Sequence, residues 1–86
     1  MHLLVRYNVA DFAKWKSVYD AHLSARQNAG LKEIHLFRNA DAPNEVTLLF
    51  SVEDVHKAKA FVGSDDLHHG MEKAGLMGGA YVSFLN

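Results

Sequence analysis

The sequence predicts an α+β fold, and three observations support this. Apolar and polar residues alternate in four segments, as they do in strands that have one buried face. Two regions between these segments instead repeat their apolar residues with the period of a helix. The order is strand, helix, strand, strand, helix, strand, which is the ferredoxin-like arrangement of a four-stranded antiparallel sheet with its helices on one face. We expect residues 1–86 to form a single domain of this kind.

The first strand is expected at residues 2–9, and a long amphipathic helix over Val9–Arg26 follows it. Asp11 is expected to cap the start of this helix, and Gly30 is expected to end it. The helix should pack its apolar stripe against the sheet. The stripe contains Phe12, Trp15, Val18, Tyr19, His22, Leu23 and Arg26.

A second strand is expected at Leu31–Asn39, with Ile34 and Leu36 on the face that meets the helices. The segment Ala40–Asn44 has the Asp, Pro and Asn residues of a hairpin turn. The third strand, Glu45–Val52, is the richest in large apolar and β-branched residues. We therefore expect it in the centre of the sheet.

The second helical region is expected to have two pieces that bend around one corner of the domain. Ser51 and Asp54 have the spacing of a capping box and should open the first piece, which Gly63 ends. Ser64 should start the second piece, which ends at Gly75. A linker over residues 77–79 and a last strand over residues 80–85 complete the prediction. The inward-facing helix residues are Val55, Ala58, Phe61, Val62, Leu67, Met71 and Ala74.

Composition excludes several classes of function. A net charge of −1 gives no general attraction to nucleic acid, and no apolar stretch is long enough to span a membrane. The chain has no cysteine, so it has no thiol nucleophile and no thiolate metal site. His68 and Glu72 share a helix face at metal-ligand spacing, but no known metal motif surrounds them, and we expect a solvated surface. We expect a cytoplasmic protein without nucleic-acid or membrane partners.

The sheet face without helices carries an apolar set that is too large to stay wet on a monomer. A second copy of the chain is the simplest cover, because two-fold homodimers are the commonest oligomers. A slip of one residue in the first or second strand would exchange the two faces and turn Tyr7 and Arg38 toward the pocket. The apolar set is Leu4, Phe37, Leu49, Tyr81 and Leu85.

The chain also resembles a known family. Residues 9–22 follow the pattern V-x-D-F-x-x-W-K-x-x-Y-D-x-H, and segments 43–46, 66–75 and 84–85 extend the likeness over nearly the whole chain. It resembles the small dimeric α/β-barrel proteins, which include antibiotic biosynthesis monooxygenase-type and cyclase-like proteins. The resemblance implies a homodimer joined through the helix-free faces, a pocket beside that face in each subunit, and no cofactor. Oxygenases of the family place an asparagine, a tryptophan and an arginine around an aromatic substrate. Asn8, Trp15 and Arg6 are of these types, although not at the family's spacing.

His35 is the first candidate for catalysis, because the alternation places it in mid-strand on the helix-free face. Its imidazole can take a proton from a phenol or an acidic carbon, and Arg6 can stabilise the anion, with Tyr81 beside them. The alternative is a histidine that is hydrogen-bonded across the dimer interface. His22 and Arg26 lie one turn apart on the apolar stripe of the first helix and can reach a pocket edge. The alternative is that His22 is a satisfied boundary residue and Arg26 extends to solvent at the helix end. The expected substrate-binding residues are Leu4, Asn8, Phe37, Thr47, Leu49, Ser83 and His22.

Two functions remain open at this point. The first is a small-molecule-binding protein that acts as a cofactor-independent monooxygenase or cyclase-like enzyme on an aromatic or conjugated substrate. The second is a non-catalytic homodimer that binds a ligand or serves in assembly. RNA-recognition modules share the strand and helix order but need stacking aromatics on the central strands, where this chain has Thr47, Leu49 and Ser51.

Overall fold

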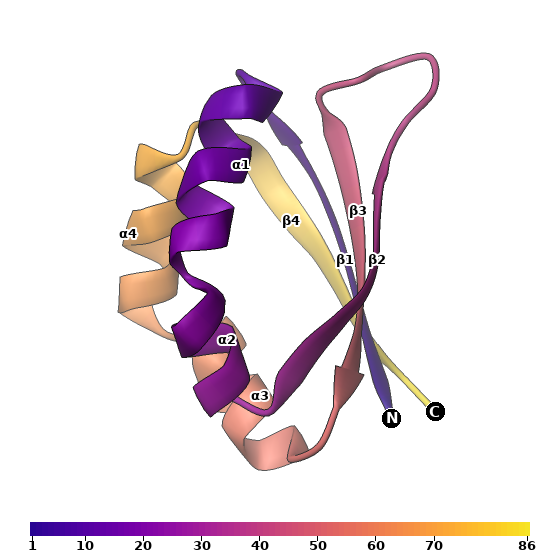
Figure 1. The fold of residues 1–86 in the computed structure, drawn as a ribbon, viewed down its shortest axis with the longest axis vertical. Helices are drawn as coiled ribbons and strands as arrows, with labels where there is room; N and C mark the ends of the chain where they lie inside the picture. Colours follow the sequence, from indigo (N-terminus) through magenta and orange to yellow (C-terminus); the bar gives the residue numbers. More distant parts are fainter.

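The computed structural model describes residues 1–86 and has the ferredoxin-like order, with each helical region divided in two. Figure 1 shows two layers, in which all the helices lie on one side of a twisted sheet and leave its other side uncovered. No helix combines the length and the apolar character needed to cross a membrane. The elements in order are β1 (His2–Val9), α1 (Phe12–Ala21), α2 (Leu23–Asn28), β2 (Leu31–Arg38), β3 (Glu45–Val52), α3 (Val55–Val62), α4 (Asp65–Lys73) and β4 (Leu76–Leu85).

The sheet is antiparallel and has the strand order β2-β3-β1-β4. The third strand therefore lies in the centre, as its composition predicts. Every second residue of β1 and β3 points to the helices and is buried, at about 1.5–3 kcal/mol of stabilisation for each large apolar side chain. The core thus lies between the sheet and the helical layer. It consists of Leu3, Val5, Tyr7, Val9, Trp15, Ala29, Leu31, Val46, Leu48, Phe50, Ala58 and Ala74.

The first helical region differs from the prediction of one helix over Val9–Arg26, because the chain breaks at His22. The backbone of His22 has φ −97° and ψ 16°, which lies outside the helical range and separates α1 from α2. The cap at Asp11 is confirmed, since its carboxylate accepts a hydrogen bond from the Lys14 backbone N–H. Helix α2 ends at Asn28, and Gly30 then takes a φ of 75° that favours glycine.

The second helical region begins at a different cap from the one predicted. Asp54 itself is the cap of α3, and its carboxylate accepts hydrogen bonds from the backbone N–H groups of His56 and Lys57. Ser51 still lies within β3, which reaches Val52, so it cannot cap a helix. The predicted cap of α4 is confirmed, because the Ser64 hydroxyl accepts from the Leu67 backbone N–H.

Two bulges alter the edge strands. In β2 the register shifts between Glu33 and His35, so Ile34 falls in the bulge and is 40% exposed rather than buried as predicted. Strand β4 starts at Leu76, so residues 77–79 belong to the strand and are not a linker. The β1–β4 register shifts beside Tyr7, and Gly78 has the positive φ of 73° that such an irregularity requires of a glycine.

Candidate active site between the helices and the sheet

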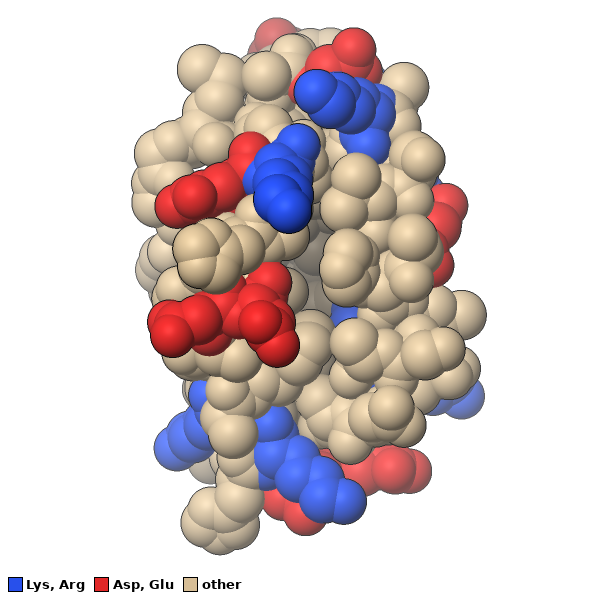
Figure 2. All heavy atoms as spheres, turned by 90° about the vertical axis from the view of Figure 1, so that its left-hand side faces the viewer, with Lys and Arg blue, Asp and Glu red and all other residues tan.

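A cavity of about 100 Å³ lies between the helical layer and the sheet. Figure 2 looks onto the helical side of the molecule, and its surface is hollowed along the middle. Fourteen of the 17 lining residues are hydrophobic, so a bound molecule would lie in a largely dry environment. The strands contribute Leu3, Val5, Tyr7, Leu31, Leu48 and Phe50; the helices and their break contribute Trp15, Val18, Tyr19, His22, Arg26, Phe61, Val62, Leu67, Gly70, Met71 and Ala74.

One wall of the cavity is aromatic. Trp15 is only 2% exposed, and its ring meets Tyr7 edge-on at a centroid distance of 5.8 Å. On its other side it stacks on Tyr19 at 4.8 Å, with 24° between the planes. Such contacts fix the orientation of the rings beyond what simple burial provides. The aromatic stripe of α1 is therefore both core and cavity wall.

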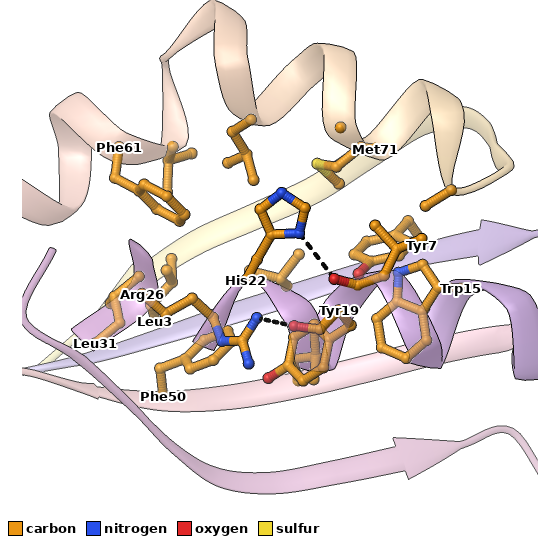
Figure 3. A pocket seen from close by; sticks show the side chains of 17 residues that line it. Leu3, Tyr7, Trp15, Tyr19, His22, Arg26, Leu31, Phe50, Phe61 and Met71 are labelled. Carbon is orange, nitrogen blue, oxygen red and sulfur yellow. Dashed lines mark hydrogen bonds between the residues drawn. The ribbon is translucent and has the colours of Figure 1, made fainter. Parts of the chain in front are cut away.

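His22 stands at the mouth of the cavity, and the helix break positions it. Its Nδ1 lies 2.8 Å from the backbone oxygen of Val18, one turn earlier in α1. A carbonyl can only accept a hydrogen bond, so Nδ1 is the donor in this contact, and in the neutral ring Nε2 is the acceptor nitrogen. Nε2 faces α4, where a Cβ added to Gly70 would lie 3.7 Å away. The imidazole is thus held with Nε2 toward the space between α1 and α4 (Figure 3).

Arg26 lies one turn further along and is 7% exposed. Its Nη1 donates to the backbone oxygen of Tyr19 at 2.6 Å, and its guanidinium carbon lies 3.6 Å from the centre of the Tyr19 ring. No carboxylate comes within ion-pair distance of it, since the chain's single salt bridge joins Lys16 to Asp20. In Figure 3 the guanidinium lies flat beside Tyr19, below the imidazole of His22. Arg26 is therefore largely buried, and its side chain packs on Tyr19 rather than extending away from the helix end.

Burial keeps the two tyrosines of the cavity protonated. It raises the pKa of the Tyr7 phenol well above its ordinary value of 10.0, although a hydrogen bond donated by Trp15 and the charge of Arg26 lower it in part. Burial and the hydrogen bond to Glu33 raise the pKa of Tyr19 still further. The Tyr19 hydroxyl donates to a Glu33 carboxylate oxygen at 2.8 Å. Both phenols therefore stay protonated at neutral pH.

A second and larger cavity, of about 560 Å³, adjoins the first between α4 and β4. The side chains that line both cavities, and so form a partition between them, are Val5, Val62, Leu67 and Met71. Three of these four come from α3 and α4, and the methionine is the most flexible. Together the two spaces are within the 300–1,000 Å³ that is usual for small-molecule sites.

The residues predicted from the sequence lie mainly on the other face of the sheet. Pairing across the strands forms one row from Phe37 through Thr47 and Arg6 to Tyr81, and a second from His35 through Leu49 and Leu4 to Ser83. Asn8 lies opposite Glu45 on the same face. Of the predicted residues only His22 lines the cavity.

Within these rows two contacts join side chains that were predicted as site residues. The Arg6 guanidinium carbon lies 5.2 Å from the centre of the Tyr81 ring, and the rings of His35 and Phe37 stack at 5.3 Å. His35 and Arg6 are not neighbours, because β3 separates their strands. A catalytic group of His35, Arg6 and Tyr81 stays a prediction, and it would need a molecule or a second chain that bridges β2 and β1.

The sequence did not point to Tyr7, Tyr19 or Gly70 as site residues, and it pointed to Arg26 only as one of two alternatives. The usable signal was the presence of two polar residues, His22 and Arg26, one turn apart on an otherwise apolar stripe. No group of three or more histidine and acidic side chains lies close enough together to hold a metal ion. His68, which has metal-ligand spacing to Glu72, has its Nε2 3.0 Å from the Val62 carbonyl.

The same fold occurs in several solved structures. A candidate antibiotic biosynthesis monooxygenase from Bordetella bronchiseptica aligns with a TM-score of 0.75 and 18% identity, over 95% of this chain and 90% of its own. SnoaB, a cofactor-independent oxygenase from Streptomyces nogalater, aligns with a TM-score of 0.70 and 13% identity, over 99% and 91%. Rv0793 from Mycobacterium tuberculosis aligns with a TM-score of 0.69 and 16% identity, over 99% and 91%.

These structures confirm the resemblance to antibiotic biosynthesis monooxygenase-type proteins at the level of the fold. No protein-family model matches the sequence, and no curated protein matches it either. Fold alone does not define a reaction, because one architecture hosts many chemistries. The residues that line the cavity are therefore the better guide to its chemistry.

Proposed function

We propose that this protein binds a small aromatic or conjugated molecule in the cavity between its helices and sheet, and oxygenates it without a cofactor. The observation that carries the proposal is the apolar, aromatic-walled cavity with His22 at its mouth, whose Nδ1 is bonded to Val18 and whose Nε2 is left as an acceptor. The likeness in fold to SnoaB, which is a cofactor-independent oxygenase, supports the same reaction class.

The chemistry needs only a base, a dry pocket and a substrate that supplies its own electrons. His22 Nε2 takes a proton from an acidic CH₂ group next to the aromatic system. The carbanion transfers an electron to O₂, the resulting radicals combine to form the carbon–oxygen bond, and the proton returns to give a hydroperoxide. Loss of water then breaks the O–O bond and the second C–H bond. In total CH₂ and O₂ become C=O and H₂O, so no external reductant is required.

A homodimer through the uncovered sheet face is the second part of the proposal. Phe37, Met77, Tyr81 and Leu85 are 55%, 57%, 52% and 40% exposed, and all lie on β2 or β4. Large apolar side chains exposed together on one sheet mark an interaction surface. A second copy would bury them, together with the rows that contain Arg6 and His35. This surface also supports the alternative of a non-catalytic assembly dimer.

The test is oxygen consumption with aromatic ketones of one, two and three rings that carry an acidic CH₂ group. We expect uptake of O₂ and, with ¹⁸O₂, one labelled oxygen in the carbonyl product. His22→Asn is the informative variant, because its amide can still donate to the Val18 carbonyl but has no basic nitrogen. It should keep the fold and lose activity by about 10²–10⁴-fold, the usual contribution of a general base.

Two results would contradict the proposal. If His22→Asn turned over at the wild-type rate, His22 would not be the base. If the variant His35→Asn were inactive while His22→Asn was active, the chemistry would lie on the uncovered face of the sheet. Binding of the ketones without any O₂ uptake would favour the non-catalytic alternative.

A further inference from the structure

We infer that the molecule bound in this cavity carries a negatively charged group and that Arg26 binds it. The inference rests on the proposed use of the cavity as a ligand site, and it adds the chemical class of the ligand. The charged group of this ligand would be a carboxylate, a phenolate or an enolate attached to its apolar part. The observation behind it is a buried guanidinium without a counterion at the wall of an otherwise apolar space.

The cavity is lined by one permanent charge, which is positive. Arg26 is the only residue with a permanent charge among those that line it, and no aspartate or glutamate does so. The carboxylate of Glu33 accepts the Tyr19 hydroxyl but forms no ion pair with Arg26. The only permanent charge that lines the cavity is therefore positive, which favours an anion over a cation there.

Most of the hydrogen-bond donors of Arg26 have no partner in the protein. A guanidinium has five N–H donors, and only Nη1 has a protein acceptor, the Tyr19 carbonyl. Removing such a cation from water without an anionic partner is unfavourable, and the ring of Tyr19 offsets this only in part. No fully buried polar side-chain atom lacks a partner, so the remaining donors of Arg26 are open to the cavity or to solvent. A carboxylate would take two of them in a planar, bidentate contact.

Arg26 lies close to His22, the proposed base, along the same wall of the cavity. His22 lies at the break and Arg26 lies one helical turn later in α2, and both line the cavity. A ligand whose anionic group contacts Arg26 would extend its rings along Trp15 toward Met71 on the far wall. An enolate formed by loss of a proton to His22 would be stabilised by the same guanidinium.

The experiment compares two small probes of nearly the same shape, benzoate and benzamide, on the intact protein. Trp15 is the only tryptophan and lines the cavity, so its fluorescence reports occupancy. We expect benzoate to bind at least about tenfold more tightly than benzamide at neutral pH. In Arg26→Met this preference should disappear, through loss of benzoate affinity with little change for benzamide.

Arg38→Met is the matched control. Arg38 also lies over an aromatic ring, Phe12 at 3.8 Å, and also donates to a carbonyl, that of Pro43 at 2.8 Å, but it does not line the cavity. This variant should bind both probes as the wild type does. If Arg26→Met does not fold, Arg26→Lys keeps the charge without the planar fork and should keep a smaller preference for benzoate.

Each outcome has a distinct meaning. Equal binding of benzoate and benzamide to the wild type would overturn the inference and leave the cavity as a ligand site. An unchanged benzoate preference in Arg26→Met would also overturn it. No binding of either probe would overturn both the inference and the proposed use of the cavity. Loss of the preference in Arg26→Met alone would support it.

Discussion

At the scale of single residues, the helix break gives two polar side chains a structural role and leaves each with reactive atoms. His22 bonds the Val18 carbonyl through Nδ1, and Arg26 bonds the Tyr19 carbonyl through Nη1. Each residue thereby satisfies a backbone oxygen near the break and is fixed in orientation. The imidazole Nε2 and the remaining guanidinium donors stay available. A purely structural role would explain the bonds but not the alignment of both groups along the cavity.

Gly70 provides a test that separates stability from function. It lies inside α4 without a positive φ, so the backbone does not require glycine there. An added methyl group would meet His22 Nε2 and Cε1 at 3.7 and 3.8 Å, which is ordinary contact. Gly70→Ala should therefore raise the free energy of unfolding by up to about 1 kcal/mol, the helix-propensity gain, and raise the Tm by several degrees. It should also reduce oxygenation, because the methyl group covers Nε2.

Calorimetry and O₂ uptake on the same Gly70→Ala sample would check both expectations. A variant that was more stable and equally active would show that Nε2 does not act through this space. Gly63→Ala, at the C-cap of α3 and outside the cavity, is the control for a glycine-to-alanine change that adds no methyl group beside His22.

At the scale of elements, the sequence was sufficient for the type and order of every strand and helix region but not for their irregularities. Alternation identified the inward faces of β1 and β3 because successive side chains of a strand point to opposite faces of the sheet. A shift of one residue would move the whole apolar set to the wrong face. The break at His22 and the bulge at Ile34 left no such trace. Both depend on packing, since helical periodicity continues through His22 and strand alternation continues through Ile34. The capping box at Ser51 failed because β3 pairs with β1 as far as Ser51.

The start of α3 predicts a particular response to acid. Hydrogen bonds from the backbone N–H groups of Lys57 and His56 lower the pKa of the Asp54 carboxyl below its ordinary value of 3.8. A carboxyl with a lowered pKa in the folded state contributes stability above its unfolded pKa and loses it as the pH falls through the folded one. We expect thermal unfolding between pH 6 and 2 to show this loss in the wild type.

Asp54→Asn should weaken that acid dependence, because asparagine caps helices without titrating. Asp41→Asn, which changes an exposed carboxyl in the β2–β3 turn, should leave it unchanged. Parallel acid profiles for the wild type and Asp54→Asn would contradict the assignment of this loss to the cap.

At the scale of the whole molecule, only 13 of 86 residues are buried, which is little for a stable domain of this size. A partner over the uncovered sheet face would bury the large apolar side chains that are exposed there. If a homodimer forms, its apparent stability should rise by up to about 1.4 kcal/mol for each tenfold increase in concentration. Thermal unfolding over a hundredfold concentration range, with native mass spectrometry, would measure this.

Leu49→Asp is the variant for the same surface. Leu49 lies on central β3 and faces away from the helices, between His35 and Leu4. A carboxylate there would be desolvated in a dimer, so we expect a monomer whose Tm is lower and independent of concentration. Ser24→Asp on α2 adds the same charge to the helical side and should stay dimeric. A wild type that is monomeric at every concentration would contradict the dimer.

The location of the cavity is the feature that sequence could not provide. The family resemblance implied a pocket beside the uncovered face, and the candidate residues followed from that face. The cavity instead depends on how far α1 and α2 stand from α4 above the sheet, a distance that no residue pattern encodes. Only the two polar residues on the stripe of the first helix pointed to this side.

The side chains between the two cavities come from other segments than His22 and Arg26 do. The size of the ligand site and its polar groups can therefore change separately in evolution. Leu67 and Met71 on α4 decide how much of the larger space joins the smaller one. His22 and Arg26 belong to the opposite helical segment and contribute nothing to the partition. Exchanging Met71 for a smaller residue would merge the two cavities, while His22, the proposed base, and Arg26, the proposed anion site, would keep their places. A lineage with this architecture can thus acquire bulkier substrates by mutating one helix and preserve its chemistry on another.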